Sequence, residues 1–212
     1  MVSDADRDAE TAIERILLTE RPEDALIAEE GAHNEGASGR RWVVDPLDGT
    51  TNFLYGFPAW AVSVALEDEH GGAVGVVHDP VRDEIFTAAR GEGARLNGQP
   101  IRVSEPEGLG AALVATGFGY DAERRRAQAE RLVAVLPNVR DIRQAGAAAL
   151  ELAWLAAGRI DGYYERGLKP WDWAAGSLLV TEAGGALRRL EDEPSGLVAA
   201  AEGIVEDLRG LM

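Results

Sequence analysis

Residues 42–53 read Trp-Val-Val-Asp-Pro-Leu-Asp-Gly-Thr-Thr-Asn-Phe, and they decide how the rest of the chain is interpreted. The apolar start predicts a buried strand that ends at Asp45-Pro46. The proline fixes the backbone between the carboxylates of Asp45 and Asp48. Both carboxylates can therefore point into one cleft, and the Leu47 carbonyl is free to join them. Oxygen ligands of this kind are the ones that hard cations such as Mg²⁺ prefer.

The next three residues, Gly49-Thr50-Thr51, offer backbone N–H groups at the predicted start of a helical turn, an arrangement that binds anions. Carboxylates for a metal followed at once by amides for a phosphate indicate a phosphoryl-transfer site. An Asp-Pro turn followed by an ordinary helix cap is the alternative. That alternative explains residues 45–48 equally well, but it does not explain the whole stretch 45–53.

Upstream of this stretch the chain predicts one helix and one strand. Ser3 can cap the helix, and Pro22 ends it. Residues 25–28 predict a short buried strand that runs into Glu29, and the polar, glycine-rich residues 31–39 predict a loop. The predicted apolar face of the helix is formed by Ala9, Ala12, Ile13, Ile16 and Leu17.

Downstream, the pattern changes near Pro106. Before it, short strands separated by turn signals indicate a largely antiparallel sheet, with strands at 59–66, 73–77 and 84–89. After it, strands (112–116, 139–142, 162–165) alternate with helices (122–136, 145–157, 171–183), and a strand pair and a short helix follow. This alternation is typical of an α/β arrangement. The prediction is an α+β half over residues 1–106 and an α/β half over 107–212, which can also be counted as one domain.

The composition is that of a folded globular protein. The chain has 212 residues, 46% of them hydrophobic and 27% charged, so it has room for one or two domains. No apolar run approaches the roughly 18 residues that span a bilayer, and the first residues do not resemble a signal peptide. With no cysteine, disulfides and thiolate sites are excluded. Cytoplasmic residence is the expectation.

The charge balance restricts the partners. There are 21 basic residues against 37 acidic ones, and the formal net charge is −16. Such a surface repels phosphate backbones and anionic lipid, so we expect neither nucleic-acid nor membrane binding. Arginines 124–126 are interpreted as the solvated face of a helix. An anionic substrate would need a local source of positive charge.

Residues 45–53 resemble the signature of the inositol monophosphatase family, which comprises Mg²⁺-dependent, lithium-sensitive phosphatases of small phosphomonoesters. Three further motifs of that family have counterparts in the expected order along the chain. These are Val2-Ser3-Asp4-Ala5-Asp6, Ala28-Glu29-Glu30, and Trp171-Asp172-Trp173-Ala174-Ala175-Gly176 with the following Glu182-Ala183-Gly184-Gly185. The resemblance therefore covers essentially the whole chain.

The resemblance implies a fold and a set of metal ligands. The fold is a layered αβαβα sandwich, here with the first outer helix missing, because family members usually carry some 40 residues before the Val2 motif. Two or three Mg²⁺ are implied, and the second half of the chain supplies one ligand. The implied ligands are Glu29, Asp45, the Leu47 carbonyl, Asp48 and Asp172. Four carboxylates in one cleft would repel each other, and bound Mg²⁺ would neutralise them and create a receptor for an anion.

The resemblance also implies the mechanism. Water activated by Mg²⁺ displaces the leaving group directly, and Glu29 helps to hold the ion that carries this water. A hydrogen-bonded pair of Thr50 and Asp6 orients the water and receives its proton. The backbone of Asp48, Gly49 and Thr50 holds the phosphate. Taken alone, Asp6 and Asp172 could be ordinary carboxylates at helix starts.

On the substrate side, Glu165 resembles the glutamate that accepts hydrogen bonds from sugar or inositol hydroxyls, with a strand-end salt bridge as the alternative. Gly146 and Ala147 align with a turn beside the substrate. The expected substrate is a small phosphorylated polyol, inositol monophosphate first. Histidinol phosphate and fructose 1,6-bisphosphate stay open, whereas the Thr-Thr-Asn-Phe ending resembles the inositol branch more than the nucleotide branch. A non-enzymatic role like that of relatives bound to the transcription machinery is the other alternative. A homodimer is expected by analogy.

Overall fold

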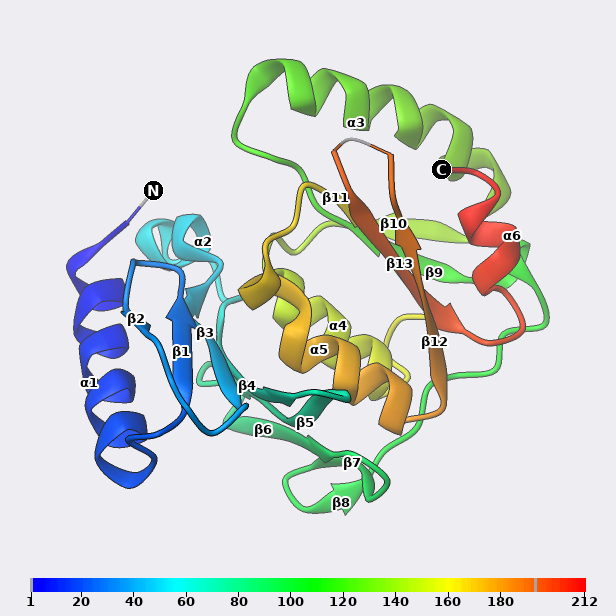
Figure 1. Cartoon of the computed structure of the whole chain (residues 1–212). Helices are drawn as coiled ribbons and strands as arrows, with labels where there is room; N and C mark the ends of the chain where they lie inside the picture. Colours follow the sequence, from blue (N-terminus) through cyan, green and yellow to red (C-terminus); the bar gives the residue numbers. More distant parts are fainter. Residues whose placement is uncertain (1, 193) are drawn as a thin grey trace.

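The computed structural model describes residues 2–192 and 194–212 and contains two β-sheets with helices between and outside them (Figure 1). The larger sheet has eight strands in the order β2-β1-β3-β4-β5-β6-β7-β8. Among the described strands of this sheet, β1 and β3 pair in parallel and the other pairs are antiparallel. Its strands are β1 (Ala25–Ala28), β2 (His33–Asn34), β3 (Arg41–Asp48), β4 (Ala61–Asp68), β5 (Gly71–Asp79), β6 (Glu84–Ala89), β7 (Gly93–Leu96) and β8 (Gln99–Pro100).

The smaller sheet has five strands in the order β10-β9-β11-β13-β12. The first of these strands along the chain, β9, has parallel neighbours on both sides, whereas β13 pairs antiparallel with β11 and β12. The strands are β9 (Leu113–Thr116), β10 (Asp141–Arg143), β11 (Gly162–Arg166), β12 (Gly185–Leu190) and β13 (Gly196–Ala201).

The helices complete five layers (Figure 1). α1 covers the outer face of the larger sheet, α4 and α5 fill the space between the sheets, and α3 and α6 cover the outer face of the smaller sheet. The αβαβα sandwich is therefore confirmed. The helices are α1 (Asp4–Glu20), α2 (Thr50–Tyr55), α3 (Ala122–Val135), α4 (Ala148–Ala156), α5 (Pro170–Glu182) and α6 (Val205–Arg209), with 3₁₀ turns at Leu109–Ala111 and Leu136–Asn138. None of the described helices is long and apolar enough to cross a membrane.

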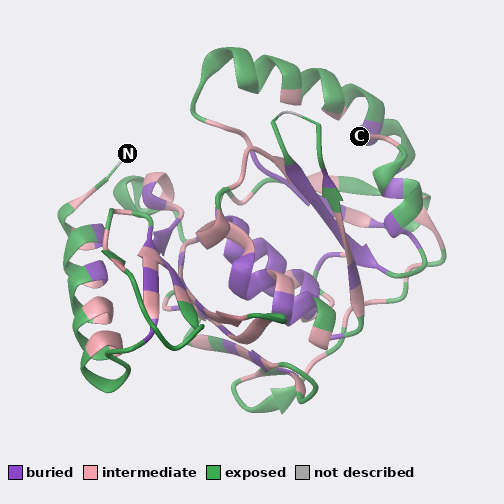
Figure 2. Cartoon of the chain, viewed as in Figure 1, coloured by how far each residue is buried: buried purple, intermediate pink, exposed green. Residues whose placement is uncertain are grey.

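The main core lies between the two sheets and is centred on α4 (Figure 2). Every residue of α4 except Trp154 is buried, because the helix is covered by a sheet on either side and by α5. Strand residues from both halves of the chain, such as Val77 and Ala199, join this one cluster. The parts of the chain before and after residue 106 share this core. Their division into two halves stays a prediction.

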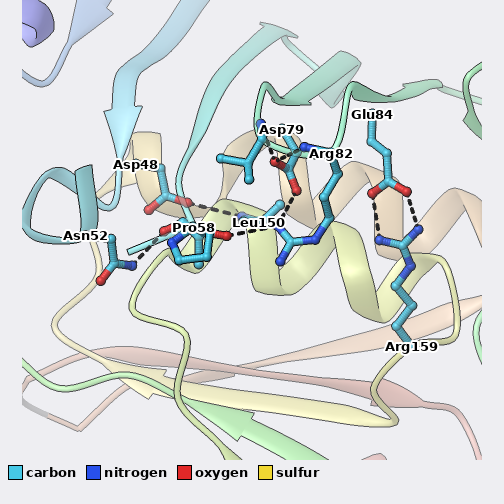
Figure 3. A network of polar contacts seen from close by, with 10 residues as sticks. Asp48, Asn52, Pro58, Asp79, Arg82, Glu84, Leu150 and Arg159 are labelled. Atoms are coloured by element: carbon cyan, nitrogen blue, oxygen red, sulfur yellow. Dashed lines mark hydrogen bonds and ion pairs between the residues drawn. The ribbon is translucent and has the colours of Figure 1, made fainter. Parts of the chain in front are cut away.

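Two polar contacts lie beside this core, and the first of them links the two halves (Figure 3). Both nitrogens of the Arg159 fork donate to the Glu84 carboxylate, at 2.7 and 2.6 Å. Arg82 pairs with the buried Asp79 at 2.8 Å and also donates to the Pro58 carbonyl. The second contact holds the β5–β6 turn against the segment that follows α2.

The buried face of α1 differs from the predicted one. Ala12 and Ile16 are not buried, while Asp6 and Glu10 are. The Glu10 carboxylate accepts hydrogen bonds from the backbone N–H groups of Glu30 and Ala32, both at 2.8 Å. These bonds set the rotation of the helix, so only Ile13 and Leu17 of the predicted face reach the small apolar cluster beneath it.

Two strand predictions also need correction. β3 does not end at Asp45-Pro46 but continues to Asp48, because an irregularity in its pairing with β4 accommodates the proline. The predicted loop 31–39 contains the two-residue strand β2. The remaining predicted helices and strands are present within a few residues of their expected bounds.

Gly176 allows α4 and α5 to approach closely, and its replacement tests this packing. A Cβ atom built there would lie 2.5 Å from Cβ of Leu152. We expect Gly176→Ala to lower the free energy of unfolding by about 1–3 kcal/mol through overpacking, measured by urea denaturation. Gly110→Ala is the matched control, because no atom lies within 4 Å of its added methyl group. Equal stability of the two variants would contradict the close contact.

Candidate active site

One cavity of about 400 Å³ brings together nearly all the predicted site residues. The end of β3, the start of α2, the turn before α4, the end of β11 and the start of α5 form its walls. Asp6 is the exception, since it lies behind this wall and contacts Thr50. The predicted residues that line the cavity are Glu29, Asp45, Leu47, Asp48, Gly49, Thr50, Gly146, Ala147, Glu165 and Asp172.

The carboxylates of Asp45 and Asp48 are held by backbone N–H groups. Asp45 accepts from Leu47 at 3.0 Å, across the proline between them. Asp48 accepts from Ala148 at 2.9 Å and from Leu150 at 3.1 Å, in the first turn of α4, and Figure 3 shows the bond from Leu150. The positive end of the helix dipole favours a carboxylate at this place. Both residues are almost completely buried, with 2% and 6% of their surface exposed.

The other two carboxylates reach the cavity from distant parts of the chain. Glu29 directly follows β1, and the parallel β1–β3 pairing places it beside Asp45. Asp172 is the third residue of α5, and it accepts a hydrogen bond from the Lys169 N–H at 2.6 Å. The strand pairing and the helix start thus bring residues separated by more than a hundred positions into one cavity.

Burial and mutual repulsion raise the pKa values of these carboxyl groups. Burial is the largest cause in each case. It raises the pKa of Asp45 well above its usual range, helped by the charges of Asp48, Glu29 and Asp172. The pKa rises to about 7 at Glu29, about 8 at Asp48 and about 6 at Asp172.

These carboxylates fit a divalent cation by the chemistry of the donor set. Within residues 2–192 and 194–212, none of the four forms a salt bridge with Lys, Arg or His. Buried charge of one sign without a partner is unfavourable unless a cation compensates it. In the same described part of the chain, no three Asp, Glu, His or Cys side chains converge around one point at ligating distance. The cavity thus collects oxygen donors, and three of the four carboxylates accept hydrogen bonds from backbone amides.

The raised pKa values predict how stability depends on pH when metal is removed with EDTA. The unfolded chain loses these protons near pH 4 to 5, whereas the folded chain keeps them up to about pH 6 to 8. The folded state therefore binds more protons in this window, and its free energy of unfolding falls as the pH rises. We expect a loss of at least about 3 kcal/mol between about pH 5 and pH 8.5, measured by urea denaturation.

Saturating Mg²⁺ should remove most of this loss, because cations neutralise the ionised carboxylates and bind only the folded state. The control is the same pair of measurements with Na⁺ at equal ionic strength. A metal-free protein that becomes more stable between pH 5 and pH 8.5 would contradict the repulsion described here.

Thr50 and Asp6 form the expected hydrogen bond. The Thr50 hydroxyl lies 3.0 Å from Asp6 Oδ1 and 3.2 Å from the Leu47 carbonyl, so its single proton can be given to either oxygen. Asp6 is fully buried. Its other oxygen accepts from the N–H of Ser3 at 2.8 Å and from the Ser3 hydroxyl. The Ser3 hydroxyl oxygen also accepts from the Asp6 N–H, and this capping box at the start of α1 fixes the Asp6 carboxylate that faces Thr50.

Glycine is required at the turn after Asp48. Gly49 has a φ of +93° and precedes α2. A Cβ atom there would lie 3.0 Å from the Ala59 carbonyl and 3.2 Å from the Ala147 side chain. Both the left-handed backbone and the close approach of neighbouring segments therefore exclude a larger residue. This packing brings the Gly49 backbone against the turn that carries Gly146 and Ala147.

Glu165 lies on the opposite wall from the carboxylates of β3. The Tyr163 hydroxyl donates to its carboxylate at 2.5 Å, so the contact nearest to it is not the salt bridge considered as the alternative. Burial raises the pKa of Glu165 to about 7, although the bond from Tyr163 lowers it in part. Gly117 lies so close to this carboxylate that a Cβ atom would overlap it.

The sequence analysis did not identify three features of the site: the role of Asn52, the segment 117–120 and the position of Arg124 at the cavity. Asn52 donates to the carbonyls of Ala59 and Ala145, at 2.6 and 2.7 Å, and so ties α2 to the turn before α4. The segment 117–120 and Arg124 line the cavity, so Arg124 does more than form a solvated helix face. Two features of the sequence could have indicated these residues. Asn52 lies within the 45–53 motif, and residue 117 directly follows a predicted strand.

Comparisons with known proteins identify the relatives of this chain. The sequence model of the inositol monophosphatase family matches residues 1–211. Nus factor SuhB of Escherichia coli (strain K12) is 46% identical over 186 residues, which are 87% of this chain and 70% of that protein. Nus factor SuhB of Pasteurella multocida is 42% identical over 214 residues, covering 98% of this chain and 80% of that protein.

Solved structures agree with the sequence relatives. The extragenic suppressor protein suhB from Bartonella henselae has a TM-score of 0.93 and 42% identity, and the match covers 99% of this chain and 85% of that chain. Inositol monophosphatase from Anabaena (Nostoc) sp. PCC 7120 has a TM-score of 0.91 and 35% identity, with coverage of 99% and 86%. From its motifs, its layered fold and these relatives, this chain belongs to the inositol monophosphatase family.

Proposed function

We propose that the protein is a Mg²⁺-dependent phosphatase of small phosphomonoesters. The observation that carries this proposal is the pair of buried carboxylates, Asp45 and Asp48, which have no basic partner among the described residues and lie beside the Thr50–Asp6 hydrogen bond. A structural cluster of acids would pair with arginine, as Asp79 does with Arg82. Buried acids without such pairing point to a bound divalent cation.

The residues that would hold Mg²⁺ are Glu29, Asp45, the Leu47 carbonyl, Asp48 and Asp172, with two or three ions in all. Bound Mg²⁺ supplies positive charge for the phosphoryl oxygens, acidifies a coordinated water and stabilises the leaving alkoxide. The protein contributes the placement of the ligands. Backbone N–H groups orient Asp45, Asp48 and Asp172 before any ion binds, which reduces the reorganisation that binding requires.

Thr50 and Asp6 would act on the attacking water. When the Thr50 hydroxyl donates to Asp6, its oxygen keeps lone pairs that can accept a proton from water and orient that water toward phosphorus. Asp6 receives the proton through this hydroxyl, and Glu29 lines the same side of the cavity. The backbone N–H groups of Gly49 and Thr50 would hold the phosphate. Water displaces the alcohol directly, without a covalent intermediate on the protein.

The substrate is proposed to be a phosphorylated polyol, with inositol monophosphate as the first candidate. Glu165, opposite the β3 carboxylates, can accept hydrogen bonds from substrate hydroxyls, and the turn at Gly146 and Ala147 would lie beside the ring. One solved relative with 27% identity and a TM-score of 0.84 is described as inositol monophosphate bound SaIMPase-II. Histidinol phosphate and fructose 1,6-bisphosphate are the alternative substrates.

Phosphate release from a panel of substrates tests this function. Inositol 1-phosphate, histidinol phosphate, fructose 1,6-bisphosphate and 3′-phosphoadenosine 5′-phosphate would be compared with and without Mg²⁺, and then with Li⁺ added. We expect Mg²⁺-dependent release that is fastest with inositol 1-phosphate and inhibited by Li⁺. Release from none of the four substrates would reject the phosphatase proposal. We also propose a homodimer, and light scattering of the same sample tests this oligomeric state.

A second candidate function comes from the relatives named Nus factor SuhB. We propose that this chain could act with the transcription machinery through protein contacts, since a net charge of −16 disfavours direct contact with RNA. The test is co-elution of the purified protein with bacterial RNA polymerase on gel filtration. Co-elution that persists in an Asp45→Asn variant would separate this role from phosphatase chemistry, and separate elution of the two proteins would argue against it.

A further inference from the structure

A second cavity, of about 380 Å³, lies beneath α3 and next to the candidate active site. Its walls come from α3, from the ends of β9 and β11 and from the β12–β13 turn, with Met212 at one side. Alternate residues of β11 point to opposite faces of the sheet. Tyr163 therefore joins the core around α4, whereas Tyr164 joins the cluster beneath α3. The volume lies in the range of small-molecule sites.

The topology of the smaller sheet explains why a crevice opens here. From β9 the chain crosses through α3 to β10 on one side, and then through α4 to β11 on the other side. The segments that follow β9 and β11 thus leave the sheet toward opposite faces. Ligands bind preferentially at such a switch point, outside the carboxyl ends of parallel strands. Gly117 and Arg166 lie at these ends and line both cavities.

Three arginines line the cavity beneath α3, in a protein whose net charge is −16. They are Arg124 and Arg131 from α3 and Arg166 from β11, against the two carboxylates of Glu165 and Asp192. Arg166 donates to the carbonyls of Asp192 and Pro194, at 3.0 and 3.1 Å, which fixes its position. Within residues 2–192 and 194–212, neither Arg124 nor Arg131 forms a salt bridge.

The Tyr164 hydroxyl is an independent sign of a missing partner. Only 5% of this residue is exposed, and its hydroxyl finds no hydrogen-bond partner among the described residues. The nearby Thr116 hydroxyl donates instead to the Tyr164 carbonyl, at 2.8 Å. Buried hydroxyls are normally hydrogen-bonded. Since Tyr164 lines the cavity together with Arg131, a ligand there could satisfy the hydroxyl.

We propose that the cavity beneath α3 binds a small organic anion, a phosphonate, phosphate or carboxylate group attached to an apolar body. Arg124 and Arg131 hold the charged group, and the Tyr164 hydroxyl donates a hydrogen bond to it. The apolar body packs against Ala127 and the ring of Tyr164. None of the candidate metal ligands lines this cavity, although it shares Gly117, Arg124, Glu165 and Arg166 with the candidate active site.

Calorimetric titration with phenylphosphonate tests this site, first with Mg²⁺ present and then with EDTA. Without Mg²⁺ the candidate active site presents carboxylates, which repel a dianion, so binding that persists in EDTA reports the cavity beneath α3. We expect Arg131→Gln and Tyr164→Phe each to weaken this binding about tenfold, the usual loss for one hydrogen bond to a charged group. Both variants should keep the phosphomonoesterase activity of the unaltered protein.

Arg126→Gln is the matched control, because Arg126 lies on the same helix but does not line the cavity. This variant should bind phenylphosphonate like the unaltered protein. Benzyl alcohol, which has the ring without the charge, should show no measurable binding. The proposal is overturned if phenylphosphonate does not bind in EDTA, or if its affinity is the same in Arg131→Gln, Tyr164→Phe and the unaltered protein.

Discussion

Asp45→Asn should abolish Mg²⁺-dependent phosphate release while leaving the fold intact. The amide oxygen of the substituted side chain can still accept the hydrogen bond that Leu47 donates to Asp45, so the backbone has no reason to move. The variant lacks the negative charge that a divalent ion requires. Metal stabilisation of a phosphoryl transition state is worth several kcal/mol, and about 4 kcal/mol corresponds to a roughly thousandfold loss of kcat/KM.

The same variant should gain stability in EDTA. The charges of Asp48, Glu29 and Asp172 repel the charge of Asp45, which is one cause of its raised pKa. Asparagine neither carries a charge that these groups repel nor takes up a proton on folding, so the free energy of unfolding should rise above that of the metal-free unaltered protein. The control is Asp68→Asn on the surface, where Asp68 pairs with Arg90 and activity should not change. Retention of more than about a tenth of the activity by Asp45→Asn, two orders of magnitude above the expected remainder, would reject the metal site.

Thr50→Val should lower kcat about a hundredfold to a thousandfold with little change in KM. Valine has the size of threonine but cannot relay a proton between water and Asp6, and general acid–base catalysis is typically worth this much. Because Asp6 and Thr50 are both buried, the lost hydrogen bond should also cost about 1–2 kcal/mol of stability. Steady-state kinetics with inositol 1-phosphate and urea denaturation would measure the two effects.

Two variants distinguish the relay from simple packing. Thr50→Ser restores the hydroxyl and should recover most of kcat. Thr51→Val removes the neighbouring hydroxyl, which contacts only the Tyr120 hydroxyl at 3.3 Å among the described residues, and it should leave kcat unchanged. If Thr50→Val and Thr51→Val have the same kcat, the Thr50–Asp6 pair has no part in catalysis.

Local sequence patterns are sufficient to predict most of the helices and strands. Apolar periodicity indicates their type, and residues such as Ser3 before α1 and Gly184 after α5 indicate where a helix begins or ends. They are insufficient where a polar side chain takes a core position. α1 turns Glu10 inward rather than Ile16, because the Glu10 carboxylate satisfies two backbone N–H groups of a distant turn. Such a pairing depends on tertiary contacts that hydrophobic periodicity does not contain.

The candidate site, like the fold, could be predicted only in part from local sequence patterns. The spacing of Asp45 and Asp48 by itself predicts a shared cleft, because both residues lie on one short segment. Glu29 and Asp172 could be assigned only through the family resemblance, since their proximity depends on strand pairing and on the start of α5. Arg124 is exposed, as expected for a solvated helix face. The packing of α3 over the β9–β11 crevice also places it at the cavity, and the sequence of the helix alone does not contain that information.

The attachment of α1 has a consequence for thermal inactivation. This outermost helix carries Asp6, and it is held by a small apolar cluster and by the bonds that Glu10 accepts. A helix so attached can detach locally at a lower free energy than the core around α4. Once it detaches, Thr50 loses its proton acceptor although both sheets remain intact. Turnover should therefore fade on heating before circular dichroism records any cooperative melting, and hydrogen exchange in residues 4–20 should quicken over the same temperatures.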